Sequence, residues 1–167
     1  MRLGYDERMP EVEFAFLADA ADTPPGQKFS VLGGGVTRIG GPTFPLRHPH
    51  IALVICLAVT VPEFGREHEV RIVLLDPDGQ EISGAQGAVV AQGAGDGRDT
   101  FVTFSVDLWS IAFPAAGDYS FRILVNGSER KRLPMQVVQM AGPVGPVPGG
   151  GPPGQNGDPD TPRHFDA

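Results

Sequence analysis

The feature that most constrains the fold is an apolar run, Ile-Ala-Leu-Val-Ile-Cys-Leu-Ala-Val-Thr-Val at residues 51–61. Side chains alternate between two faces along a β-strand. One face of this run has the large residues Ile51, Leu53, Ile55, Leu57, Val59 and Val61. The other has the small residues Ala52, Val54, Cys56, Ala58 and Thr60. β-branched residues and the following Pro62 favour a strand over a buried helix. The run predicts a central strand covered on both faces.

The sequence does not indicate which residues cover the small face of this strand. A strand with one face in water carries polar residues on that face, and this one does not. A loop, a short helix or a second molecule could provide the cover. We therefore predict a protein partner, or self-association, through the face formed by Ala52, Val54, Cys56 and Ala58.

Period-two alternation recurs in several further segments and predicts strands there. In the first of them, we expect Phe14 and Phe16 to pack against the large face of the central strand. Trp109 lies in an apolar stretch that ends at Pro114, and we expect it in the core as part of a plug at one end. Asn126-Gly127 is a strong hairpin signal. The pattern predicts an all-β protein, an immunoglobulin-like β-sandwich of about seven or eight mostly antiparallel strands.

Composition divides the chain into three parts. Residues 1–10 form a polar leader, which we expect to be flexible, and residues 11–140 form the sandwich domain. Residues 141–167 hold seven Gly and seven Pro. Ordering such a segment costs roughly 1–2 kcal/mol of backbone entropy per residue, with almost nothing apolar to offset it. We therefore predict a disordered C-terminal tail.

Charge and cysteine usage argue against several classes of protein. A net charge of −7 and a pI of about 4.9 oppose nucleic-acid binding, which depends on neutralising phosphates. The apolar run is shorter than the roughly 20 residues that a membrane-spanning helix needs. Acidic residues interrupt the region where a signal peptide would lie, and the single Cys56 cannot form an internal disulfide. We predict a cytoplasmic protein that binds neither nucleic acid nor membrane.

Three segments carry a resemblance to a known family. They are Phe14-Ala15-Phe16-Leu17-Ala18-Asp19, Lys28-Phe29-Ser30-Val31-Leu32-Gly33-Gly34-Gly35 and Ile51-Ala52-Leu53-Val54. The chain resembles a bacterial family of unknown function, small, predominantly β, single-domain proteins with an F-A-x-L-A-D opening and a glycine triplet. The resemblance implies a β fold over about residues 14–138. It implies no activity and no catalytic residue.

The glycine triplet at residues 33–35 is not a phosphate-binding loop. Such a loop ends in Gly-Lys-Ser/Thr and opens a helix, whereas Thr37-Arg38-Ile39-Gly40-Gly41-Pro42 follows here. We interpret the triplet as a bulge or tight crossing and predict no cofactor. His48 and His50 lack the further ligands of a metal site, so we predict no metal. We place Arg47, His48 and His50 on a loop before the central strand and predict a contact patch there.

No nucleophile, base and acid in the sequence form a recognisable catalytic set, so we predict no catalytic residue. Our first hypothesis is a non-catalytic interaction or structural module that binds through a sheet face or end loops. The alternative is a β-sandwich that binds a small ligand, a sugar or a lipid, near Trp109 or between the sheets. A hydrolase is the third and least favoured hypothesis.

Overall fold

A computed structural model describes residues 9–142, and it confirms an all-β chain folded into two sheets. The described part has nine strands, somewhat more than the seven or eight expected. They are β1 (Glu11–Asp22), β2 (Ser30–Gly34), β3 (Arg38–Gly41), β4 (Leu46–Val59), β5 (Glu67–Leu75), β6 (Glu81–Val90), β7 (Thr100–Phe113), β8 (Gly117–Val125) and β9 (Ser128–Gln139). Of the predicted leader and tail, residues 1–8 and 143–167 lie outside the described residues.

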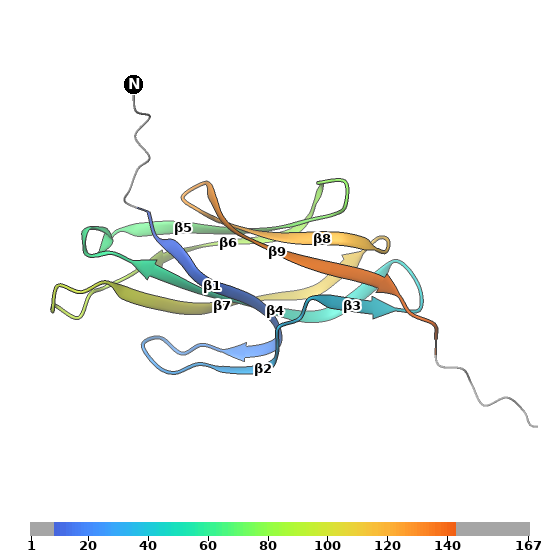
Figure 1. The fold of residues 1–167 in the computed structure, drawn as a ribbon, viewed down its shortest axis with the longest axis horizontal. Helices are drawn as coiled ribbons and strands as arrows, with labels where there is room; N and C mark the ends of the chain where they lie inside the picture. The colour runs from blue at the N-terminus through green and yellow to red at the C-terminus, as the bar shows by residue number, and fades with distance from the viewer. Residues whose placement is uncertain (1–8, 143–167) are drawn as a thin grey trace, which may run out of the picture.

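The two sheets face each other as the layers of a sandwich (Figure 1). The four-stranded sheet has the order β2-β1-β4-β7, and the five-stranded sheet has the order β3-β9-β8-β5-β6. Every pairing is antiparallel except that of β3 with the end of β9, which is parallel. The strands β7 and β6 therefore end their respective sheets.

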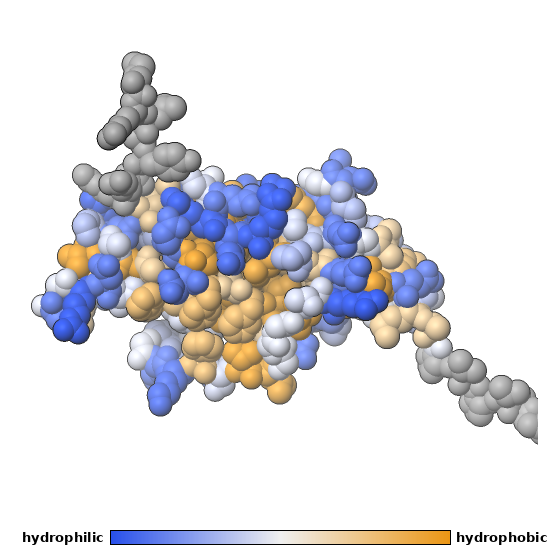
Figure 2. All heavy atoms as spheres, viewed as in Figure 1, coloured by the Kyte–Doolittle hydropathy of each residue, from blue (hydrophilic) through white to orange (hydrophobic). Residues whose placement is uncertain are grey.

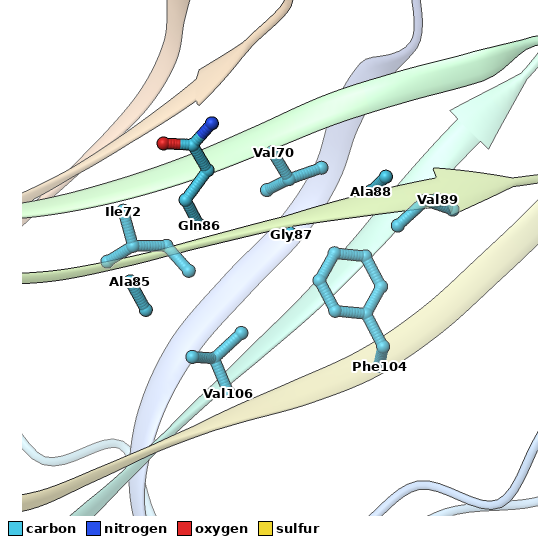
Figure 3. Close-up of a pocket in the computed structure, with 9 residues that line it drawn as sticks. All are labelled: Val70, Ile72, Ala85, Gln86, Gly87, Ala88, Val89, Phe104 and Val106. Carbon is cyan, nitrogen blue, oxygen red and sulfur yellow. The ribbon is translucent and has the colours of Figure 1, made fainter.

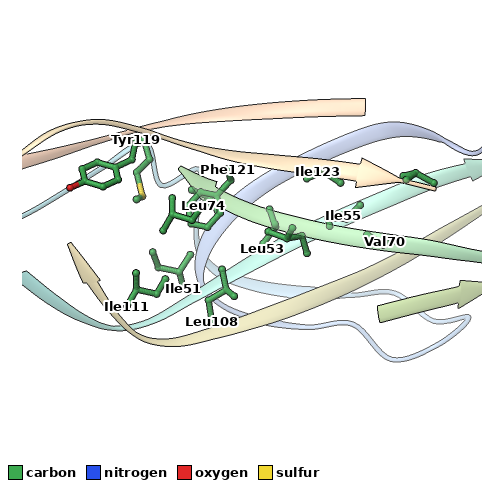
Figure 4. Packing of buried hydrophobic residues seen from close by; sticks show 14 of the residues in the cluster. Ile51, Leu53, Ile55, Val70, Leu74, Leu108, Ile111, Tyr119, Phe121 and Ile123 are labelled. Carbon is green, nitrogen blue, oxygen red and sulfur yellow. The ribbon is translucent and has the colours of Figure 1, made fainter. Parts of the chain in front are cut away.

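The large face of β4 lies at the centre of the core (Figure 4). Ile51, Leu53 and Ile55 are buried against residues of β5 and β8, among them Ile72 and Phe121. Burying one such side chain stabilises the fold by about 1.5–3 kcal/mol. The predicted central strand is confirmed, and it begins earlier than expected, at Leu46.

The face of β1 that carries Phe14 and Phe16 does not point into the core, as we had expected it to do. Its pairing with β4 shifts register between Val12 and Phe14, so that Val12 lies opposite Leu57 but Phe14 lies opposite Cys56. Opposite residues of an antiparallel pair share a face. The bulge therefore turns Phe14 away from the core. The expectation that Phe14 and Phe16 pack on the large face of β4 was wrong.

The small face of β4 is covered by the chain itself. Ala52 and Val54 have no exposed surface, and Cys56 is 2% exposed. Beyond Ala18, β1 turns back beneath β4 and pairs with β2 (Figure 1). We call this two-stranded unit of residues 18–34 the ribbon. The rings of Phe14 and Phe29 lie 6.1 Å apart at its edge. Of the covers that the sequence left open, the structure thus has a segment of the same chain.

The glycine at position 33, near the end of the ribbon, is favoured for steric reasons. Gly33 has a φ of +60°, and a Cβ there would overlap the carboxylate of Asp19. This region of φ favours glycine, because a side chain is strained in it. Within the triplet, Gly33 therefore marks a close approach of β2 to the Asp19 side chain of β1.

The turn predicted between the last two strands is confirmed. Asn126 and Gly127 have φ values of 48° and 80° and form the tight turn between β8 and β9. Tyr119, 2% exposed, donates a hydrogen bond from its hydroxyl to the Ala115 carbonyl oxygen at 2.8 Å. Its ring also packs edge-on against Phe113, with centroids 5.1 Å apart. This bond to a carbonyl a few residues upstream is the one that a tyrosine corner makes.

Candidate functional site

An exposed tryptophan stands on β7, the outer strand of the four-stranded sheet. Trp109, predicted to be a core residue, is instead 70% exposed. It lies opposite His50 in the pairing of β4 with β7, and its ring centroid is 4.1 Å from that of the imidazole. The next residue, Ser110, has a φ of 52°, a strained value for a residue with a side chain. Trp109 faces outward because it follows the buried Leu108 in the strand, and the local turn at Ser110 then brings Ile111 back to the core.

Two hydrogen bonds hold the imidazole beneath the indole. His50 Nδ1 donates to the Asp19 carbonyl oxygen, and His50 Nε2 donates to Asp107 Oδ1, each at 2.7 Å. A carbonyl oxygen and a carboxylate oxygen are both hydrogen-bond acceptors, so the imidazole is the group that donates in this arrangement. The same ring packs against Trp109, with the two ring planes inclined by 35°. We call Asp19, His50, Asp107 and Trp109 the Trp109 cluster.

The predicted contact residues lie on a strand and not on a loop. Arg47, His48 and His50 all belong to β4, because Leu46 already pairs with Phe113. Arg47 is exposed. His48 is half-buried and lies opposite the buried Ile111, so it does not share the face of the Trp109 cluster. The structure joins only His50 of the three to the cluster.

The hydrogen bonds of His50 bear on the hydrolase hypothesis. A general base needs one ring nitrogen free to take the proton of a nucleophile. Both nitrogens of His50 are occupied by protein acceptors. Within residues 9–142, no hydrogen bond joins a serine hydroxyl to a histidine, and the Ser105 hydroxyl bonds to Thr23.

A second polar cluster lies buried after β4, where residues 61–63 form a short 3₁₀ turn. Glu63 is 1% exposed, and its Oε2 accepts hydrogen bonds from the Thr60 backbone N–H at 2.6 Å and the Thr60 hydroxyl at 2.9 Å. His68 is 3% exposed, with Nε2 3.4 Å from the Glu63 carbonyl oxygen and Nδ1 3.1 Å from Asn126 Nδ2. These bonds tie the turn to β5 and to the β8–β9 hairpin.

Sequence reasoning missed this second cluster, although a signal was present. Thr60-Val61-Pro62-Glu63 has the T-x-x-E spacing of a capping box.

Among the residues that the structure describes, no three His, Cys, Asp or Glu side chains gather as a metal site would need. The same part of the chain contains no helix long and apolar enough to cross a membrane.

Apolar side chains are also exposed away from Trp109. Figure 2 shows a hydrophobic surface over β2 at the lower edge of the molecule, with hydrophilic side chains gathered over the five-stranded sheet. Leu32 of β2 is 70% exposed, the same fraction as Trp109. Other large exposed apolar side chains are Phe29, Val31, Val61, Val90, Phe101 and Met140. Exposed apolar side chains that are scattered singly over a surface are normal.

The model of one family, described as a family of unknown function (DUF6941), matches residues 13–138. No curated protein matches the chain.

Three of the solved structures that match the chain are distant likenesses. The Pseudomonas fluorescens alkylpurine DNA glycosylase AlkC, bound to DNA with an abasic site analog, is 15% identical with a TM-score of 0.37; the match covers 60% of this chain and 27% of that one. The C-terminal domain of wzt is 12% identical with a TM-score of 0.43, covering 78% and 74%. The CARDB domain of the PF1109 protein from Pyrococcus furiosus, in complex with di-metal ions, is 12% identical with a TM-score of 0.35, covering 81% and 99%. The chain thus spans about a quarter of the glycosylase, and no functional argument rests on TM-scores this low.

Proposed function

The chain belongs to the DUF6941 family of proteins of unknown function, and we propose that it is a non-catalytic interaction module that binds a protein partner through the Trp109 cluster. The observation that carries this proposal is an indole 70% exposed yet held against a hydrogen-bonded imidazole. The ring gains little from folding, because most of its surface stays in water.

Such a residue suits the centre of an interface. Tryptophan is enriched among the few residues that dominate binding energy, since it buries a large area with few rotatable bonds. Because His50 already restrains the ring, part of the side-chain entropy of Trp109 is lost when the protein folds. This part of the entropy is not lost again when a partner binds. Exposed Asp107 and Arg47, at the two sides of His50 along the sheet, would supply polar contacts at the rim.

The non-catalytic part of the proposal is supported by the hydrogen bonds of His50, which leave no ring nitrogen for a substrate. We also propose a cytoplasmic location, which the single free Cys56 supports. Cell fractionation tests the location, and recovery of the protein from an oxidising compartment would contradict it.

The test compares two single substitutions at equally exposed apolar positions. Trp109→Ala removes the proposed anchor, and Leu32→Ala removes a side chain of the same exposure from β2. Each variant, and the wild type, is used to capture proteins from the native host under identical conditions. We expect a partner that binds the wild type and Leu32→Ala and is lost with Trp109→Ala. Retention of every captured protein by Trp109→Ala would refute the proposal.

A further inference from the structure

A cleft of about 140 Å³ lies between the edges of the two sheets, where β6 faces β7. In Figure 3, Phe104 and Val106 project from β7 toward side chains of β5 and β6, and the amide of Gln86 points away from them. The lining residues are Val70, Ile72, Ala85, Gln86, Gly87, Ala88, Val89, Phe104 and Val106. The cleft lies on the core side of β7, whereas Trp109 is on the outer side.

The cleft exists because β6 has small residues at its inward positions. Ala85 lies opposite Ile72 of β5, and Gly87 lies opposite Val70. Opposite residues share a face, so Ala85 and Gly87 point to the core side with these two buried side chains. A Cβ added at Gly87 would meet no atom within 4 Å. The missing side-chain volume leaves the space that Phe104 and Val106 border.

The position of the cleft makes it accessible. β6 and β7 each end their sheet, so among the described strands none closes the gap between them. Within residues 9–142, β6 pairs with β5 alone. A ligand can enter between the two edge strands without separating a paired strand.

The lining decides the chemistry of the occupant. None of the nine lining residues is charged, and the one side-chain amide points away from the space. Removing a charge or an unpaired polar group from water into such a site is costly, so a charged group is excluded. An apolar cavity of about 150 Å³ in another protein binds benzene, and this cleft has nearly the same volume.

We propose that the cleft between β6 and β7 is a binding site for an uncharged hydrocarbon group of about the size of benzene. The group contacts Phe104, Val106, Val70 and Ile72, and any polar remainder of the ligand stays in water at the opening between the edge strands. This site is separate from the Trp109 cluster and goes beyond the proposed protein interaction.

The test uses benzene itself as the probe, with the full chain labelled on its methyl groups. Binding is followed by NMR at the methyls of Val70, Ile72, Val89 and Val106. We expect saturable shifts at these methyls, with methyls outside the cleft unaffected. No saturable shift, or shifts of the same size across the whole protein, would overturn the proposal.

The blocking variant is Gly87→Leu, which fills the cleft from β6 at a position with free space. We expect it to weaken benzene binding at least tenfold. Val106→Phe fills the same space from β7, and it is the blocking variant to use if Gly87→Leu does not fold. Trp109→Ala is the matched control and should bind benzene as the wild type does, so the two proposals can fail independently. Unchanged binding by a folded filling variant would place benzene elsewhere and refute the site.

Discussion

The hydroxyl of Thr23 lies 3.0 Å from the hydroxyl of Ser105, although the two residues are 82 positions apart. The Ser105 backbone N–H also donates to Thr23 Oγ1 at 2.9 Å. Thr23 follows the last residue of β1, and Ser105 belongs to β7, on the far side of β4. The pair therefore fastens the ribbon across the small face of the central strand.

Substituting Thr23→Val keeps the shape of the side chain and removes the hydroxyl. We expect a loss of about 1–2 kcal/mol in the free energy of unfolding, because the Ser105 N–H loses its partner. The ribbon should also open more often and expose Cys56, so labelling by a thiol reagent should become about tenfold faster for each 1.4 kcal/mol. Denaturant melts and labelling rates measure the two effects. Thr43→Val, at an exposed loop position, is the control and should change neither.

His50→Ala should release the indole of Trp109. Trp109 is the single tryptophan of the chain, so its fluorescence reports on this site alone. We expect a faster decay of fluorescence anisotropy and a destabilisation of about 1 kcal/mol, since the bond to the half-exposed Asp107 is screened by water. His48→Ala, on the other face of β4, should leave the anisotropy unchanged. Equal anisotropy in the wild type and His50→Ala would show that the imidazole does not restrain the ring.

Two glycine-to-alanine substitutions should have opposite effects on stability. Gly127 has a φ of 80°, where a side chain is strained, so Gly127→Ala should destabilise the protein by roughly 1–2 kcal/mol. Gly87 lies in a strand with free space around it, so Gly87→Ala should stabilise the protein by about 0.5–1 kcal/mol. Thermal or denaturant unfolding compares them, and a shift of the same sign for both would contradict the backbone conformations of Gly127 and Gly87.

Tyr119→Phe tests the turn before β8. The substitution keeps the ring contact with Phe113 and removes the bond to the Ala115 carbonyl oxygen. We expect a loss of about 1 kcal/mol, the usual net value of such a bond. Chemical denaturation measures it. Wild-type stability in Tyr119→Phe would mean that water replaces the hydroxyl without cost.

The sequence predicted best those features that depend on neighbouring residues. The alternation of Ile51, Leu53 and Ile55 identified the central strand, because a buried strand imposes that period on its own residues. The Asn126-Gly127 turn was equally local, since two residues with positive φ determine its geometry.

Features that depend on distant partners were missed. The bulge that turns Phe14 toward Cys56 arises from the pairing of β1 with β4, and the alternation within β1 cannot reveal it. Trp109 was missed for another reason: it follows the buried Leu108 and so points outward by the alternation of β7 itself, but its apolar neighbours made it resemble a core residue. In the candidate site, the sequence indicated His50, but Asp19 and Asp107 join it only through the fold.

The long separation between Thr23 and Ser105 has a consequence for how the chain is synthesised. The ribbon emerges first, but its anchoring residue on β7 is made 82 residues later. Until then, the apolar run at residues 51–61 has neither its neighbour β7 nor a secured cover. A nascent chain thus displays its most aggregation-prone segment for the whole interval between β4 and β7. The strand that organises the mature protein is also the one most in need of protection at the ribosome.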